Sequence, residues 1–123
     1  MRKRTAKQTK LYRTTALAIL RKCGAQVDEA THRMYILETR LGTLRISIWD
    51  TSIMCCFDDV ARATAELGTS GDFLNPHSGK WNWMGGLNHE EDMADLEQFE
   101  RGLLALMPES YTPNPDLPLA DFH

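Results

Sequence analysis

The stretch TLRISIW, residues 43–49, decides the fold of this chain. Leu44, Ile46 and Ile48 alternate there with polar and aromatic positions, a period of two that is typical of a strand with one buried face. Residues 34–39 and 53–57 are also strand-like, and each is separated from this stretch by a short turn. Because short connections favour antiparallel neighbours, the three segments predict a β-meander.

Helical patterns flank this strand region. Residues 7–23 place apolar side chains three and four apart and stop before Gly24, a residue that commonly follows a helix end. Asp58 and Asp59 supply the cap of a second predicted helix that runs to Leu67. A third helix is predicted after a cap at Asn88, with apolar residues at positions 93, 96, 99, 103 and 106.

The order of these elements predicts an α+β fold. With a short fourth strand at 81–84 the order is α-β-β-β-α-(β)-α, a small antiparallel sheet of three to four strands with three helices. Residues 26–32, of mixed polarity, are a further strand candidate. The first and third helices are expected to cover the sheet.

The chain of 123 residues fits one domain. We divide it into a basic flexible arm at 1–9, a single α+β domain at 10–107, and a Pro-rich C-terminal tail at 108–123.

Composition predicts a cytoplasmic location. The longest apolar runs are only a few residues, far below the ~20 that a membrane span needs. The basic N-terminus lacks the continuous apolar centre of a signal peptide. Cys55 and Cys56 are adjacent and Cys23 stands alone, without a C-x-x-C pair. Reduced thiols are therefore expected, not disulfides or a zinc knuckle.

Charge is segregated along the chain, although the net charge is only −3. Residues 1–22 hold eight basic residues and no acid, so the other 101 residues, with six bases and 17 acids, carry −11. Such a basic segment attracts an anionic surface, which can be nucleic acid, an acidic partner, or an acidic face of the same chain.

No pattern in the sequence predicts catalysis, a metal or a cofactor. The SGK at 78–80 lacks the glycine that a phosphate-binding loop needs five positions before its Gly-Lys pair. No H-x-x-x-H pair occurs. Cys55 or Cys56 could act with His77, but a free cysteine in a strand is usually a small buried apolar residue. We therefore predict a protein that is not an enzyme.

Two surfaces are predicted to contact a protein partner. The acidic outer face of the third helix suits a basic protein. The loop 75–83 carries two tryptophans two positions apart, which serve either as core or interface anchors or as a platform for stacking bases. The predicted partner-binding residues are Glu90, Glu91, Asp95, His77, Lys80, Trp81 and Trp83.

Nucleic-acid binding through the N-terminal arm is the alternative. Basic side chains contact phosphates, and this arm is the one segment with the required charge. The residues predicted for this role are Arg2, Lys3, Arg4, Lys7 and Lys10.

Two motifs, FDDVARA at 57–63 and NPHSGKWN at 75–82, carry a resemblance that covers about residues 43–83. They resemble a pattern in small uncharacterised accessory proteins of bacteria, phages and plasmids. That pattern has no assigned activity, so it implies no catalytic residues here. It implies a context in which such proteins often bind a host protein, including inhibitors of CRISPR-type defence complexes. A non-enzymatic binding module with a partner of this kind is the resulting expectation.

Overall fold

The computed structural model describes residues 5–30, 34–48, 53–67, 80–83 and 92–119. These residues form the helices and strands α1 (Ala6–Lys22), β1 (Gln26–Val27), β2 (Tyr35–Thr39), β3 (Gly42–Ile48), β4 (Ile53–Phe57), α2 (Val60–Leu67), β5 (Lys80–Trp83) and α3 (Asp92–Leu106). The strands make one antiparallel sheet in the order β1-β2-β3-β4-β5. The predicted α+β class, with a small antiparallel sheet and three helices, is confirmed.

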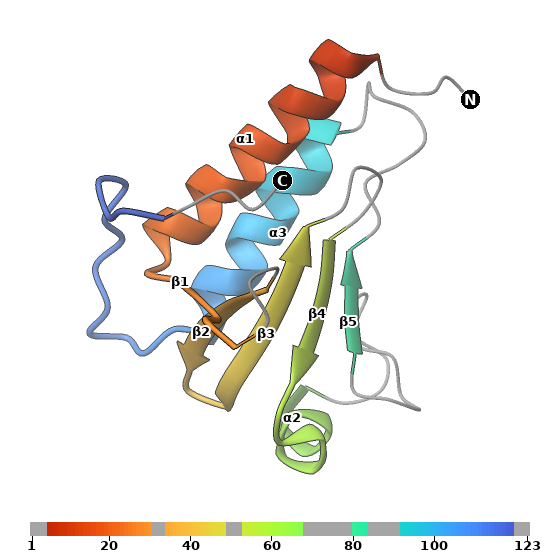
Figure 1. The fold of residues 1–123 in the computed structure, drawn as a ribbon. Coiled ribbons are helices and arrows are strands. Elements are labelled where there is room, and N and C mark those ends of the chain that lie inside the picture. Colours follow the sequence, from red (N-terminus) through yellow and green to blue (C-terminus); the bar gives the residue numbers. More distant parts are fainter. Residues whose placement is uncertain (1–4, 31–33, 49–52, 68–79, 84–91, 120–123) are drawn as a thin grey trace.

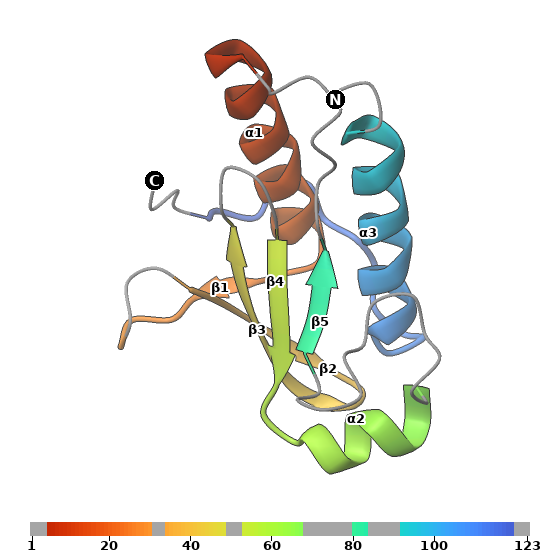
Figure 2. The same cartoon turned by 90° about the vertical axis from the view of Figure 1, so that its right-hand side faces the viewer.

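The molecule has two layers, as Figure 1 shows. α1 and α3 lie side by side on one face of the sheet, and α2 lies at one end of it (Figures 1 and 2). The prediction that the first and third helices cover the sheet is therefore confirmed. We call the opposite face of the sheet, turned away from α1 and α3, the outer face; Figure 2 looks onto it.

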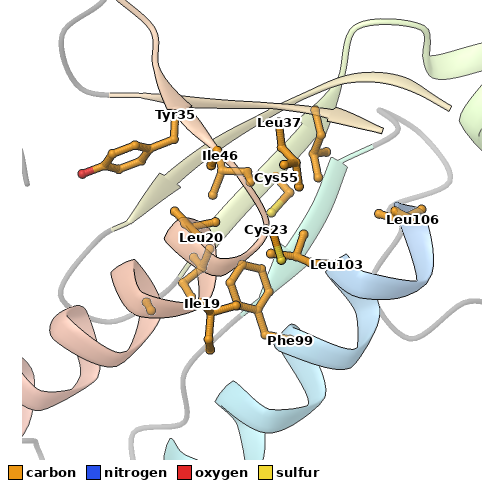
Figure 3. Packing of buried hydrophobic residues seen from close by; sticks show 14 of the residues in the cluster. Ile19, Leu20, Cys23, Tyr35, Leu37, Ile46, Cys55, Phe99, Leu103 and Leu106 are labelled. Atoms are coloured by element: carbon orange, nitrogen blue, oxygen red, sulfur yellow. The ribbon is translucent and has the colours of Figure 1, made fainter. Parts of the chain in front are cut away.

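The core lies between the sheet and the two covering helices. Alternate strand residues point into it, because Leu44 and Ile46 of β3 pair in register with Phe57 and Cys55 of β4, and all four are buried. α1 contributes a stripe that includes Leu20, and α3 contributes a second stripe of apolar residues. Figure 3 shows these side chains pointing toward one another, with labels on Ile19, Leu20, Cys23, Tyr35, Leu37, Ile46, Cys55, Phe99, Leu103 and Leu106.

The ends of α1 are fixed by local hydrogen bonds. Thr5 and Gln8 form a capping box, in which each side chain accepts a hydrogen bond from the other residue's backbone N–H. The helix therefore starts at Ala6, inside the segment 1–9 that the sequence analysis assigned to the arm. Gly24 has φ +81° and donates to the Arg21 carbonyl, a left-handed termination that glycine adopts without strain.

The sheet has one strand more than the four predicted, because two residues of the candidate strand 26–32 pair with β2. The paired register ends at Val27, and the next residue, Asp28, donates its backbone N–H to the Met34 carbonyl. The Asp28 carboxylate then accepts from the Ala30 N–H at 3.1 Å, a turn that bends the chain away from the sheet.

The turn between β2 and β3 joins the ends of α2 and α3. The Arg40 N–H donates to the Leu106 carbonyl at 2.9 Å, and the Arg62 guanidinium donates to the Arg40 carbonyl at 2.8 Å. Asp59 accepts from the Arg62 N–H, so the predicted aspartate cap of the second helix is confirmed. The predicted caps Gly68 and Asn88 lie outside the described residues.

The C-terminal segment returns to the end of α1. Its described part, up to Leu119, contains no helix, as the proline content predicted. The Tyr111 hydroxyl and the Asn114 N–H both donate to the Lys22 carbonyl, at 2.6 and 3.1 Å. This segment therefore satisfies a carbonyl that the last turn of a helix otherwise leaves without a protein donor.

Candidate functional site

Many of the predicted contact residues lie outside the part of the chain that the structure describes. For the protein partner these are His77, Glu90 and Glu91, and for nucleic acid they are Arg2, Lys3 and Arg4. Their roles remain predictions.

The structure places the three predicted residues of β5 on different faces of the sheet. Lys80 pairs in register with Cys56, whereas Trp81 pairs with Cys55 and Trp83 pairs with Ile53. Directly opposed residues of antiparallel strands share a face. The two tryptophan positions are therefore in register with the helix-covered face of β4 and the Lys80 position with its outer face, and the predicted partner contacts of these residues remain predictions.

The basic and acidic segments of the chain meet where α1 and α3 lie side by side. α1 has five basic residues and no acid, and α3, which includes Asp95, has four acids and one arginine. Lys22 of α1 forms an ion pair with Glu100 of α3. The basic segment thus contacts an acidic face of its own chain, one of the three options that its charge left open.

Three of the other four basic residues of α1 divide into two groups. Arg13 is buried and donates to the Ile48 carbonyl at 2.9 Å, so it serves the packing of α1 on the sheet. Lys7 and Lys10 are exposed near the start of the helix, and no ion pair to a described residue is found for either.

A groove of about 310 Å³ runs between α1 and α3. Its floor is apolar, because Ile19 and Leu96 contribute buried side chains there. Its remaining lining residues are Thr15, Ala18 and Lys22 of α1, Glu97 and Glu100 of α3, and Pro115 of the C-terminal segment. The small side chains of Thr15 and Ala18 leave the space that a bulkier residue would fill.

The groove is polar at one end and apolar along its length. The Lys22–Glu100 ion pair and Pro115 stand at the end where the C-terminal segment meets α1. Toward the start of α1, Leu11 lies one helical turn before Thr15 and is 55% exposed. Glu97 is exposed beside the groove. An apolar side chain that entered the groove would therefore have a carboxylate beside it.

The outer face of the sheet carries an ion-pair cluster centred on Arg45. Its Nε donates to Asp58 at 2.8 Å and its Nη2 donates to the second carboxylate oxygen at 3.1 Å. Its Nη1 donates to Asp28 at 2.8 Å. The hydrogen bond to Asp58 is the largest cause of the raised pKa of Arg45, followed by the charge of Asp58. The cluster ties the end of β1 and the end of β4 to the centre of the sheet.

The cysteines occupy unlike environments. Burial raises the pKa of the Cys23 thiol to about 11, with a further contribution from Glu100 that Lys22 opposes. Burial also raises the pKa of Cys55, in the core. Cys56 is half-buried on the outer face, opposite Arg45 in the register of β3 and β4. Because the thiolate is the nucleophile, Cys55 is poorly placed for the covalent chemistry that the sequence analysis considered for Cys55 or Cys56.

Among the described residues no group of three or more His, Cys, Asp or Glu side chains is placed to hold a metal ion. No helix of the same residues is both long and apolar enough to cross a membrane.

We compared the chain with known protein families, curated proteins and solved structures. A scan against protein-family models and searches of curated proteins and of solved structures find no match to this chain. The described residues form a two-layer α+β architecture with a groove between the two helices that cover the sheet.

The groove and the Arg45 cluster were not among the predicted sites. The groove requires that α1 and α3 be neighbours, and their sequences are separated by the whole sheet. The sequence indicated part of the Arg45 cluster, because Arg45 is on the polar side of an alternating strand and Asp58 directly follows the next strand. Asp28 had no signal of its own in the sequence.

Proposed function

We propose that this chain is a non-enzymatic protein-binding module, and that it binds a bulky apolar side chain of its partner in the α1–α3 groove. The observation that carries the proposal is the groove itself, with an apolar floor at Ile19 and Leu96 and exposed Glu97 beside it. Protein partners commonly anchor in this way, with an apolar side chain in a pocket and polar contacts at the rim.

The acidic helix supports a basic partner, as the sequence predicted. Lys22 neutralises Glu100, so Glu97 is the lining carboxylate that remains available to a cation of the partner. Asp95 belongs to the same helix, two positions before Glu97. Long-range attraction to these acids would speed the encounter and orient the partner.

The test compares two tryptophan variants in capture from bacterial lysate. Ala18→Trp fills the groove, and Met54→Trp places the same side chain on the outer face. We expect the unmodified chain and Met54→Trp to capture the same partner proteins. Ala18→Trp should capture at least tenfold less of each. A direct titration of each captured protein against the three chains then tests the contact. Equal capture by all three proteins, with both variants folded by circular dichroism, would refute the groove as the binding site.

We propose further that the partner belongs to a bacterial defence complex and that the protein acts in the cytoplasm. The resemblance of residues 43–83 to accessory proteins of mobile elements supports the first part. Three free cysteines, two of them buried, fit a reducing compartment. Expression of the chain in cells with active CRISPR-type interference should restore the survival of a targeted plasmid, and unchanged plasmid loss would count against this partner.

Nucleic-acid binding is the second candidate, favoured by the exposure of Lys7 and Lys10 at the start of α1. If both lysines contact phosphates, K7E/K10E should remove about two phosphate contacts. The plot of log affinity against log salt concentration, measured with short DNA or RNA, should then become less steep by about two. The absence of binding at low salt, where electrostatic attraction is strongest, would reject this function.

A further inference from the structure

We propose that the C-terminal segment sets the length of the α1–α3 groove, because it holds Pro115 as a movable wall at one end of the groove. We call residues 108–119 the strap. This inference rests on the proposed function, since it adds a specificity determinant to the same groove. Pro115 is the residue that meets a long occupant, and Tyr111 is a positioning residue that acts through Pro115.

The strap is joined by hydrogen bonds to a single backbone atom of α1. The hydrogen bonds found between the strap and the other described residues come from the Tyr111 hydroxyl at 2.6 Å and from the Asn114 N–H at 3.1 Å, and both end on the Lys22 carbonyl oxygen. We call this pair of hydrogen bonds the latch. The next residue after Asn114 is Pro115, which lines the groove. The latch therefore fixes the position of Pro115 relative to α1.

The end of α1 has the space that the latch requires. A Cβ atom at position 24 would lie 3.1 Å from the Tyr111 hydroxyl oxygen, so the hydroxyl reaches its acceptor beside Gly24, which has no side chain. A turn within the strap then orients Pro115, because the Asp116 N–H donates to the side-chain oxygen of Asn114 at 3.0 Å. Both features place the proline ring at the end of the groove.

Pro115 is the rigid part of that end. Lys22 and Glu100 also line it, but their ion pair joins two flexible side chains that are 35% and 25% exposed and can move aside with an occupant. The ring of Pro115 has a fixed φ and moves only with the strap. The groove residues Thr15 and Lys22 are about 10 Å apart along α1 at the rise of an α-helix. An occupant longer than this span therefore requires the strap to move away.

The strap can open without loss of the fold. Leu119, beyond Pro115, packs against the core, so opening is a local movement between two held ends. Removal of the Tyr111 hydroxyl should raise the open fraction about threefold to tenfold, the effect of one neutral hydrogen bond. An occupant that binds only when the strap is open gains affinity by the same factor, whereas one that fits the closed groove gains nothing.

Linear primary alcohols measure the length of the groove, because they are neutral and differ only in the number of methylene groups. Butanol, hexanol and octanol are titrated into the full chain, and the NMR shifts of the Ile19 and Leu96 methyl groups at the groove floor report binding. In the unmodified protein we expect affinity to rise from butanol to hexanol through added apolar contact and not to rise further for octanol. Ala18→Trp, which fills the groove, should abolish binding of all three.

Variants of the strap identify its wall. Tyr111→Phe should bind octanol about threefold to tenfold more tightly, and Pro115→Ala should bind it at least as tightly as Tyr111→Phe, both with unchanged affinity for butanol. Because the latch acts through Pro115, the double variant should bind octanol no better than Pro115→Ala alone. Pro118→Ala is the matched control, since Pro118 belongs to the strap but is not among the described residues that line the groove, and it should bind octanol as the unmodified chain does.

The outcomes separate the strap from the groove. An octanol affinity that continues the rise from butanol to hexanol in the unmodified protein, or additive effects of Tyr111→Phe and Pro115→Ala, would overturn the role of the strap and leave the groove as the binding site. The absence of methyl shifts with every alcohol would overturn the proposed function as well. Circular dichroism of each variant verifies that the fold is retained.

Discussion

The helix-covered face and the outer face of the sheet are built from alternate residues of the same strands, and two adjacent cysteines show how they differ. Cys55 is buried among apolar side chains opposite Ile46. Cys56, one position on, is half-buried opposite Arg45, which two carboxylates hold in place. The helix-covered face thus stabilises the fold through close packing, whereas the outer face positions chain segments through directed polar contacts. The two kinds of contact should respond differently to substitution, pH and salt.

The largest expected difference is between Ile46→Ala and Met54→Ala. Ile46 is fully buried, so its truncation should lower the free energy of unfolding by about 3–4 kcal/mol through lost burial and a residual cavity. Met54 is 36% exposed on the outer face, and its truncation should cost less than about 1 kcal/mol. Urea unfolding monitored by circular dichroism measures both values. Similar losses would show that the outer face is packed as tightly as the core.

Alkaline pH should act on the core between the sheet and the covering helices, which includes Cys23 at the end of α1. A thiol in the unfolded chain ionises near pH 9.0, whereas burial raises the pKa of Cys23 to about 11, so the folded protein keeps a proton that the unfolded chain loses. The urea midpoint should therefore be independent of this thiol below pH 9 and should fall between about pH 9 and pH 11. Cys23→Ala should show a smaller fall, with Cys55 accounting for part of the rest. An identical fall in the variant would remove Cys23 from this explanation.

On the outer face, substitution of Asp28 should lower the free energy of unfolding more than substitution of Asp58. Both carboxylates bind Arg45, but the side chain of Asp28 is only 9% exposed and also accepts from the Ala30 N–H, whereas that of Asp58 is 46% exposed. We expect Asp28→Ala to cost about 1–2 kcal/mol and Asp58→Ala less than about 1 kcal/mol. Measuring the free energy of unfolding of both variants at low and at high salt separates the two contributions. Only the contribution of Asp58 should decrease strongly as salt rises. The reverse ranking would contradict the assigned geometry.

The most local expected effect concerns the C-terminal segment, which lies outside both faces of the sheet. Tyr111→Phe removes one hydrogen bond to the Lys22 carbonyl and keeps the ring, so it should cost about 0.5–1.5 kcal/mol. Amide hydrogen exchange should be faster at the C-terminal end of α1 and unchanged in β3 and β4. Unchanged exchange in α1 would mean that the Asn114 N–H satisfies the carbonyl without help.

The fold could be predicted from the sequence wherever one local signal determined the outcome. Alternation in 43–49 fixed the burial of Leu44 and Ile46, and Gly24 marked the end of α1 because its φ is positive. β1 was only a candidate, since two paired residues depend on β2 and on the turn made by Asp28 and not on a local pattern. The start of α1 required recognition of the Thr5–Gln8 pair.

The candidate site could be predicted only in part. The acidic third helix and the basic first helix were recognised from composition, and the structure shows that Lys22 and Glu100 join them. The groove between them depends on packing across the sheet, which places Ala18 near Leu96 although 78 positions separate them along the chain. Alternation along a strand already sets the Lys80 position apart from the Trp81 and Trp83 positions, but the register with β4, which aligns the tryptophan positions with the helix-covered face, could not be read from the loop.

The return of the C-terminal segment to α1 has a consequence for the order in which the protein matures on the ribosome. Lys22 is synthesised among the first residues, but its carbonyl acquires the Tyr111 hydroxyl only after 89 further residues have been added. The strands between them are sequential neighbours and can pair as they emerge. A nascent chain that stalls before residue 111 should therefore contain a paired sheet and an α1 with an incompletely bonded C-terminal turn, which is where cellular proteases would be expected to begin.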